Sequence, residues 1–106
     1  MRKITGWDIG GANLKAASLG PDGLQIIQRP FAIWEARDAL PDALHEMAKQ
    51  LGTNECAGVT ITAELSDAFR SKREGIAFVL ESLQTALPGD TRVRVFGTDG
   101  QFHDPA

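Results

Sequence analysis

The residues with the clearest chemical potential lie near the start of the chain, at positions 7–15 (WDIGGANLK). Two glycines follow the end of an apolar run there. Because glycine has no Cβ atom, Gly10 and Gly11 allow a tight turn in which backbone N–H groups approach a ligand closely. Successive N–H groups make a concave site that suits an anion such as phosphate. The segment therefore predicts a phosphate-binding turn formed by Gly10 and Gly11.

Two charged side chains flank this turn. Asp8 could hold Mg²⁺ or orient water on it, since hard cations prefer oxygen ligands. Lys15 alternates with Asn13, so it can point to the same side as Asp8 and neutralise phosphate oxygens. The alternative is a plain hairpin with a surface Asp8 and Lys15. The Asp-x-Gly-Gly pattern is short, and it is not the Gly-x-x-x-x-Gly-Lys-Ser/Thr phosphate loop.

A second group of polar residues lies at positions 60–67 (TITAELSD), where a predicted strand ends. Sheets of α/β proteins place ligand-binding groups at the carboxyl ends of their strands. Thr62 offers a hydroxyl there, and Glu64 and Asp67 offer carboxylates. These three residues form the predicted second wall of the site, although the same residue types also serve simply to cap turns.

Seven elements are predicted to position these residues. Strands are predicted over residues 2–9, 13–19, 24–33, 57–63 and 92–96. Apolar residues at helical spacing predict one helix that Asp38 caps and Gly52 ends, and another that Ser71 caps. Short turns make the first three strands an antiparallel meander. The order β-β-β-α-β-α-β predicts a mixed α/β sheet with helices packed on it, as in a ribonuclease H-like or actin-like half-domain.

Size and charge narrow the class of protein. The 106 residues fit a single domain, and 11 Lys and Arg against 14 Asp and Glu give a net charge of −3. A nucleic-acid-binding protein usually has a basic face, so nucleic acid is not an expected partner. A membrane span needs roughly 20 apolar residues, which this chain lacks, and a cytoplasmic location is expected. The single cysteine excludes an internal disulfide.

Three segments together resemble a known family. Residues 6–17 (GWDIGGANLKAA) are similar to the N-terminal phosphate loop of the hydantoinase/oxoprolinase-like group within the actin-like ATPase superfamily. Residues 7–13 (WDIGGAN) resemble one branch in particular, the tetrahydromethanopterin-linked one-carbon transfer proteins, which includes methanofuran biosynthesis. Residues 62–69 (TAELSDAF) and 96–102 (FGTDGQF) resemble later segments of that branch. The resemblance therefore extends along essentially the whole chain.

This resemblance implies that residues 1–106 form the N-terminal domain of a longer two-domain enzyme. The implied reaction joins a furfuryl diphosphate to a glutamylated tyramine phenol and releases pyrophosphate. Asp8 would hold Mg²⁺ and, with Lys15, take part in catalysis. The residues implied to bind a diphosphate ligand or ATP are Gly10, Gly11, Asn13, Thr62, Glu64 and Asp67. Ala12 stands where the wider superfamily often has a threonine that binds phosphate, which counts against generic ATP hydrolysis.

Three other functions stay open at this point. One is an ATP-dependent hydantoinase or kinase-like enzyme. Another is a ribonuclease H-like nuclease, in which Asp8, Glu64 or Asp67, and Asp99 would gather two metal ions. The third is a non-enzymatic assembly module. The expected partners are a phosphorylated small molecule and the remainder of the same protein, and the isolated domain is expected to form a homodimer through an exposed apolar flank.

Overall fold

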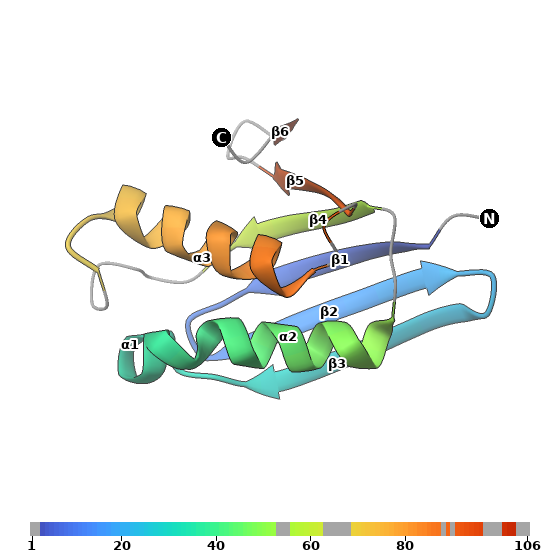
Figure 1. Cartoon of the computed structure of the whole chain (residues 1–106), viewed down its shortest axis with the longest axis horizontal. Helices are drawn as coiled ribbons and strands as arrows, with labels where there is room; N and C mark the ends of the chain where they lie inside the picture. Colours follow the sequence, from blue (N-terminus) through green and yellow to red (C-terminus); the bar gives the residue numbers. More distant parts are fainter. Residues whose placement is uncertain are drawn as a thin grey trace.

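A six-stranded mixed sheet with helices on one face forms the protein (Figure 1). The computed structural model describes residues 3–52, 56–62, 69–87, 89, 91–96 and 101–103. The strands are β1 (Ile4–Ile9), β2 (Asn13–Gly20), β3 (Gly23–Pro30), β4 (Cys56–Ile61), β5 (Arg92–Phe96) and β6 (Phe102–His103). The helices are α1 (Ile33–Ala36), α2 (Leu40–Leu51) and α3 (Lys72–Ala86), with a 3₁₀ turn (Arg37–Ala39) between α1 and α2.

The strand order is β3-β2-β1-β4-β5-β6. Strands β1, β2 and β3 form the predicted antiparallel meander, in which Gly23, with φ of 104°, closes the second turn. Strand β4 pairs parallel to β1, and β5 pairs parallel to β4, after crossovers through α2 and α3 respectively. The mixed sheet and the order of the seven predicted elements are therefore confirmed, while α1 and β6 are additional elements that the sequence did not predict.

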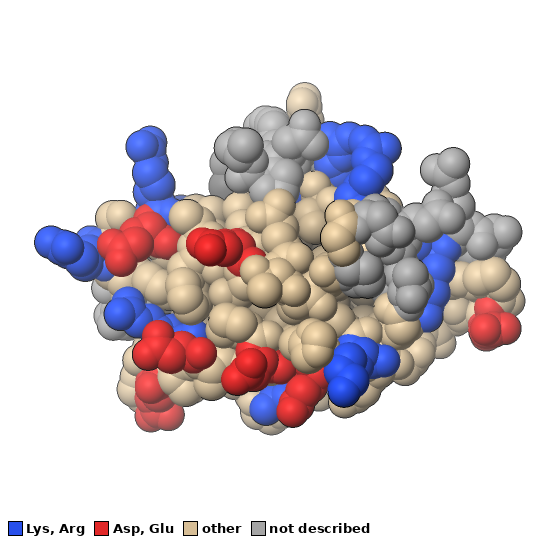
Figure 2. Space-filling model, viewed as in Figure 1, with Lys and Arg blue, Asp and Glu red and all other residues tan. Residues whose placement is uncertain are grey.

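The hydrophobic core lies between the sheet and the two long helices. Alternate residues of β1 point into it, because successive side chains of a strand face opposite sides of the sheet. Trp7 and Ile9 are buried in this way, whereas Asp8 between them is only half-buried. Leu44 of α2 and Leu83 of α3 are fully buried against the same face. Acidic and basic side chains are interspersed over the outside of the helical layer (Figure 2).

Helix boundaries follow the sequence signals in all but one place. The Ser71 side chain accepts a hydrogen bond from the Glu74 backbone N–H at 3.1 Å, as the capping-box spacing predicts. Gly52, with φ of 80°, ends α2 as expected. The predicted cap at Asp38 is wrong: α2 begins at Leu40, its N-cap is Ala39, and no side chain caps it. The preceding 3₁₀ turn leads the backbone directly into α2, so the first turn of α2 continues an existing helical segment.

Two strand boundaries also differ from the prediction. The third strand was expected over residues 24–33 but ends at Pro30, and Ile33 begins α1. A proline has no N–H to donate to a neighbouring strand, which favours a strand end there. The apolar run 31–33 fits a strand or a buried helix equally well, which is why periodicity placed it wrongly. Strand β4 covers Cys56–Ile61, and residues 2 and 63 of the predicted strands lie outside the described residues.

None of the helices in the described part of the chain combines the length and apolar character that a membrane crossing requires.

Replacing Ser71 by Ala tests the capping interaction of α3. The substitution leaves the Glu74 N–H without its acceptor, and we expect the free energy of unfolding to fall by about 1 kcal/mol. In a domain of this size that loss lowers Tm by roughly 4–8 °C, which thermal denaturation followed by circular dichroism measures. Ser71→Asp keeps an acceptor oxygen and should retain most of the stability. An equal loss in both variants would contradict the assigned cap.

Candidate phosphate-binding site at the ends of β1 and β4

The carboxyl ends of the adjacent parallel strands β1 and β4 bring Asp8 and Thr62 together. The Thr62 Oγ1 donates a hydrogen bond to Asp8 Oδ1 at 3.0 Å. The Thr62 backbone N–H donates to the Ile9 carbonyl at 3.0 Å, which extends the strand pairing one residue past β4. The backbone bond thus holds Thr62 in register, and its hydroxyl then orients one oxygen of the half-buried Asp8 carboxylate.

The glycine turn between β1 and β2 is closed by its own backbone. The Gly10 N–H donates to the Asn13 carbonyl at 3.0 Å, and the Ala12 carbonyl accepts from the Phe31 N–H at 2.9 Å. A Cβ atom on Gly10 would lie 3.1 Å from the Asn13 carbonyl oxygen and 3.4 Å from Thr62 Oγ1. A side chain at position 10 would therefore be crowded, and the Asn13 backbone would have to shift by a few tenths of an ångström to admit it.

The same bonds identify which backbone groups of the turn remain for a ligand. The Gly10 N–H is already used inside the turn, so Gly10 contributes shape and not a donor. Within the described part of the chain, neither the Gly11 N–H nor the Ala12 N–H has an acceptor. Successive N–H groups in a turn can form a concave site for an anion, and these two are the donors that the turn leaves for one. The sequence did not identify Ala12 as a donor, because a backbone N–H is present whatever the side chain and the alanine side chain itself offers no polar group.

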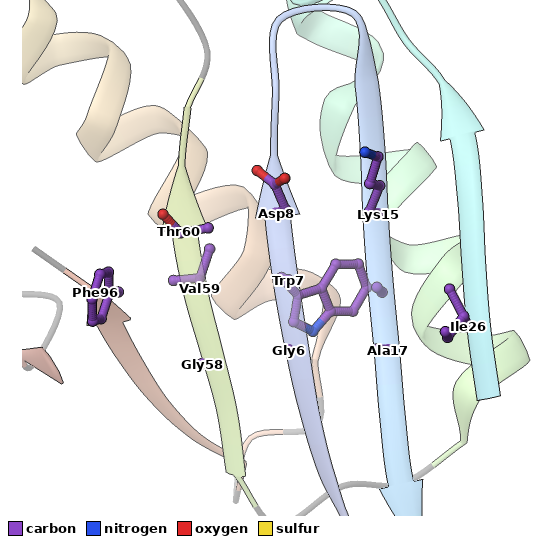
Figure 3. Close-up of a pocket in the computed structure, with 11 residues that line it drawn as sticks. Gly6, Trp7, Asp8, Lys15, Ala17, Ile26, Gly58, Val59, Thr60 and Phe96 are labelled. Atoms are coloured by element: carbon purple, nitrogen blue, oxygen red, sulfur yellow. The ribbon is translucent and has the colours of Figure 1, made fainter. Parts of the chain in front are cut away.

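Asn13 and Lys15 lie on β2 beside Asp8. Asp8 and Lys15 are register partners in the antiparallel pair and lie side by side on the sheet face opposite the helices (Figure 3). Lys15 is exposed and makes no hydrogen bond or ion pair with another described residue. The Asn13 Oδ1 accepts a hydrogen bond from Gln28 Nε2 at 3.2 Å, so this side chain is oriented by β3. The Lys15 ammonium is therefore available to an anion held at the turn.

The remaining predicted residues Glu64 and Asp67, and Asp99 of the nuclease alternative, lie outside the described residues. Among the residues that are described, no three His, Cys, Asp or Glu side chains gather in a way that could hold a metal ion. The donor chemistry at Asp8 nonetheless suits Mg²⁺, which proteins commonly bind through one or two carboxylates together with substrate phosphates and waters. One Asp8 oxygen accepts from Thr62, and the other has no partner among the described residues.

The strand order and the helix placement define a ribonuclease H-like fold, the class to which actin-like ATPase domains also belong. RuvC of T. thermophilus, solved in complex with a Holliday junction substrate, is similar over 93% of this chain and 66% of its own, with 12% identity and a TM-score of 0.59. The Aquifex aeolicus PPX-GPPA enzyme is similar over 89% of this chain and 36% of its own, with 17% identity and a TM-score of 0.52. The predicted fold class is confirmed.

One curated relative is more similar to this chain in sequence than the two solved structures are. The chain is 31% identical over 99 residues to (4-{4-[2-(gamma-L-glutamylamino)ethyl]phenoxymethyl}furan-2-yl)methanamine synthase of Methanocaldococcus jannaschii. The match covers 93% of this chain and 28% of the synthase, so the chain spans less than a third of that relative's length. No protein-family model matches the chain. The name of the relative describes an enzyme that makes a phenoxymethyl furan, which supports the predicted resemblance to the methanofuran-biosynthesis branch. The resemblance to the hydantoinase/oxoprolinase-like group stays a prediction.

Alanine substitutions at Gly10 and Gly6 test the packing of the turn, because a Cβ atom is crowded at Gly10 and meets no neighbour at Gly6. Both backbones have φ outside the left-handed region, so only the added Cβ atom matters. Gly10→Ala forces the Cβ against the Asn13 carbonyl, and we expect it to lower the free energy of unfolding by about 1–3 kcal/mol. Gly6→Ala meets nothing within 4 Å and should raise it by about 0.5–1 kcal/mol.

Urea denaturation of the two variants and the parent chain measures both effects. Equal changes at the two positions would contradict the close packing assigned to the turn.

Proposed function

We propose that this chain supplies the diphosphate-binding part of an enzyme that forms an aryl ether at a furfuryl carbon and releases pyrophosphate. The observation that carries the proposal is the pair of N–H groups at Gly11 and Ala12, which have no acceptor among the described residues and lie beside Asp8 and Lys15. The similarity to the M. jannaschii synthase supports the choice of reaction. Because the chain spans only 28% of that synthase, the furan and phenol sites would belong largely to other parts of a longer protein.

In the proposed reaction the bond between the furfuryl carbon and the diphosphate oxygen breaks, and its electron pair leaves with the diphosphate. The phenol oxygen of the tyramine unit forms the new bond to that carbon, and the phenol proton passes to the solvent or to the released pyrophosphate. Negative charge therefore grows on the leaving diphosphate. Groups already oriented toward developing charge give the largest catalytic effect in reactions of this kind.

Each residue of the described site has a role in this scheme. The Gly11 and Ala12 N–H groups would donate to one phosphoryl group, and the Lys15 ammonium would neutralise a neighbouring oxygen. Asp8, oriented by Thr62, would hold Mg²⁺, and the ion would supply positive charge to the diphosphate when bound. Asn13 would keep the turn in place through its backbone carbonyl, which accepts from Gly10.

A small phosphorylated ligand fits the chain better than a polynucleotide does. The likeness to RuvC is 12% in sequence and concerns the fold alone. Acidic and basic side chains are mixed on the helical face, and the net charge is −3, whereas proteins that bind nucleic acid concentrate positive charge on one face (Figure 2). The turn offers two N–H groups and one lysine to a ligand. That set of contacts suits one or two phosphoryl groups.

Binding of pyrophosphate to the 106-residue chain tests the site directly. In a ¹H–¹⁵N NMR titration with pyrophosphate and Mg²⁺, we expect the Gly11 and Ala12 amides to shift most, with a dissociation constant in the millimolar range. Lys15→Gln should weaken binding about tenfold, because it removes one charge-assisted interaction. Asp8→Asn should remove the dependence on Mg²⁺ while leaving the weaker metal-free binding in place.

Lys49→Gln is the matched control, since Lys49 is an exposed lysine in the last turn of α2, on the other face of the sheet. It should bind pyrophosphate as the parent does. A Lys49→Gln variant that loses as much affinity as Lys15→Gln would indicate nonspecific attraction, and an absence of shifts at Gly11 and Ala12 at 10 mM pyrophosphate (roughly the upper end of the millimolar range) would overturn the proposed site.

A further inference from the structure

Residues 31–39 connect the glycine turn with the start of α3. The Phe31 N–H donates to the Ala12 carbonyl at 2.9 Å, which fixes the beginning of this connection at the turn. Farther along, the Arg37 guanidinium lies 5.2 Å from the centroid of the Phe69 ring, which is a cation–π contact. Phe69 is buried shortly before α3 begins. The connection therefore runs along the end of the sheet where the candidate site lies (Figure 1).

One large apolar side chain in this connection is left exposed. Ile33 is fully buried and holds the short helix α1 against the core, and the Ala32 carbonyl accepts two backbone N–H groups of α1 at 3.1 Å. Trp34 lies on this fixed backbone but is 60% exposed, whereas Trp7, the other tryptophan, is 2% exposed. Packing against the described residues therefore accounts for Trp7 but covers less than half of the Trp34 side chain.

The position of Trp34 sets it apart from the other exposed apolar side chains. Five further large apolar side chains of the described chain are exposed, and all of them lie on strands of the sheet: Ile4, Leu19, Leu24, Ile26 and Phe96. Trp34 instead lies on the connection that the bond between Phe31 and Ala12 ties to the glycine turn. Its indole is therefore presented beside the candidate diphosphate site.

We propose that Trp34 is the surface on which the furan ring of the substrate stacks, an inference that rests on the proposed function. In a furfuryl diphosphate, the carbon that bears the leaving oxygen is bonded directly to the furan ring, so the ring must lie next to the phosphoryl groups. Trp34 is three residues from Phe31, and their Cα atoms are therefore at most about 11 Å apart. Phe31 in turn is bonded to Ala12, the residue whose N–H would donate to the diphosphate.

An indole offers such a ring two favourable interactions. Flat aromatic rings stack in an offset arrangement and gain more than the burial of their surface alone. As the bond to the diphosphate breaks, its electron pair leaves, so positive charge develops on the furfuryl carbon and the furan ring. The face of an indole attracts positive charge. Trp34 would thus hold the ring before the reaction and stabilise the charge that forms on it, and it would be the part of the furan site that this chain supplies.

Two unreactive ligands isolate the contribution of the ring. Both are phosphonate analogues in which CH₂ replaces the ester oxygen, one of furfuryl diphosphate and one of tetrahydrofurfuryl diphosphate. The second has a ring of similar size that is neither flat nor aromatic. With Mg²⁺ present, we expect the 106-residue chain to bind the furfuryl analogue about fivefold more tightly, as measured from the NMR shifts of the Gly11 and Ala12 amides.

Substitutions at position 34 test whether the preference comes from the indole. Trp34→Ala removes the stacking surface and should make the two affinities equal, while Trp34→Phe should keep most of the preference. Pyrophosphate has no ring, so its affinity should stay the same in both variants. Leu24→Ala is the matched control, because Leu24 is 63% exposed beside the turn at the other end of the sheet, and it should leave the preference unchanged. A preference that survives in Trp34→Ala, or that Leu24→Ala lowers equally, would overturn the proposal.

Tryptophan fluorescence gives an independent readout in the parent chain. Trp7 is buried, so acrylamide quenches mainly the exposed Trp34. The furfuryl analogue should protect Trp34 from quenching, whereas pyrophosphate should not. Equal quenching in the presence of the two ligands would contradict stacking on Trp34.

Two further ligands separate the other outcomes. In ADP a ribose separates the aromatic base from the phosphates, so a loss of affinity for ADP alone in Trp34→Ala would identify adenine as the occupant and overturn the furan. Pyrophosphate distinguishes the two levels of the inference. If it shifts the Gly11 and Ala12 amides while the preference for the furfuryl analogue is missing, only the role of Trp34 fails. If it shifts neither amide, the proposed diphosphate site fails, and this inference fails with it.

Discussion

The parallel pairing of β1 with β4 is the constraint on which the rest of the structure depends. It brings Thr62 next to Asp8 across 54 residues of sequence. The Thr62 N–H donates to the Ile9 carbonyl, and the Thr62 hydroxyl donates to Asp8. A parallel pair needs a crossover connection, which here passes through α2, so the helix that covers the core also sets the register of the site. If the register of β4 slipped by one residue, its inward and outward side chains would exchange faces.

Strand β1 serves two different environments because its side chains alternate. Trp7 and Ile9 point into the core between sheet and helices, while Gly6 and Asp8 point to the opposite face. The hydrophobic residues hold the strand in the centre of the sheet, and this rigid position is what allows Asp8 to be aimed by a single hydroxyl. The indole N–H of Trp7 is buried without a hydrogen-bond partner among the described residues, so the burial of its large apolar ring outweighs the loss of that bond.

The elements that the sequence predicted well are those with strong local signals. Ser71 and Glu74 have the capping-box spacing, and Gly52 has the backbone freedom that a helix end needs, so both boundaries of this type were predictable. Asp38 failed as a cap because a preceding 3₁₀ turn supplied the start of α2, which no local pattern indicates. Residues 31–33 were misplaced because an apolar triplet has the same appearance in either type of element.

At the candidate site, residue types were predictable but the donors were not. The sequence pointed to the turn at Gly10 and Gly11, yet only the three-dimensional structure distinguishes a closely packed glycine from one whose N–H has no acceptor among the described residues. The use of the Gly10 N–H by Asn13, and the unpaired N–H at Ala12, are properties of the hydrogen-bonding pattern. Contacts made through the backbone do not depend on residue type, so a pattern of side chains cannot reveal them.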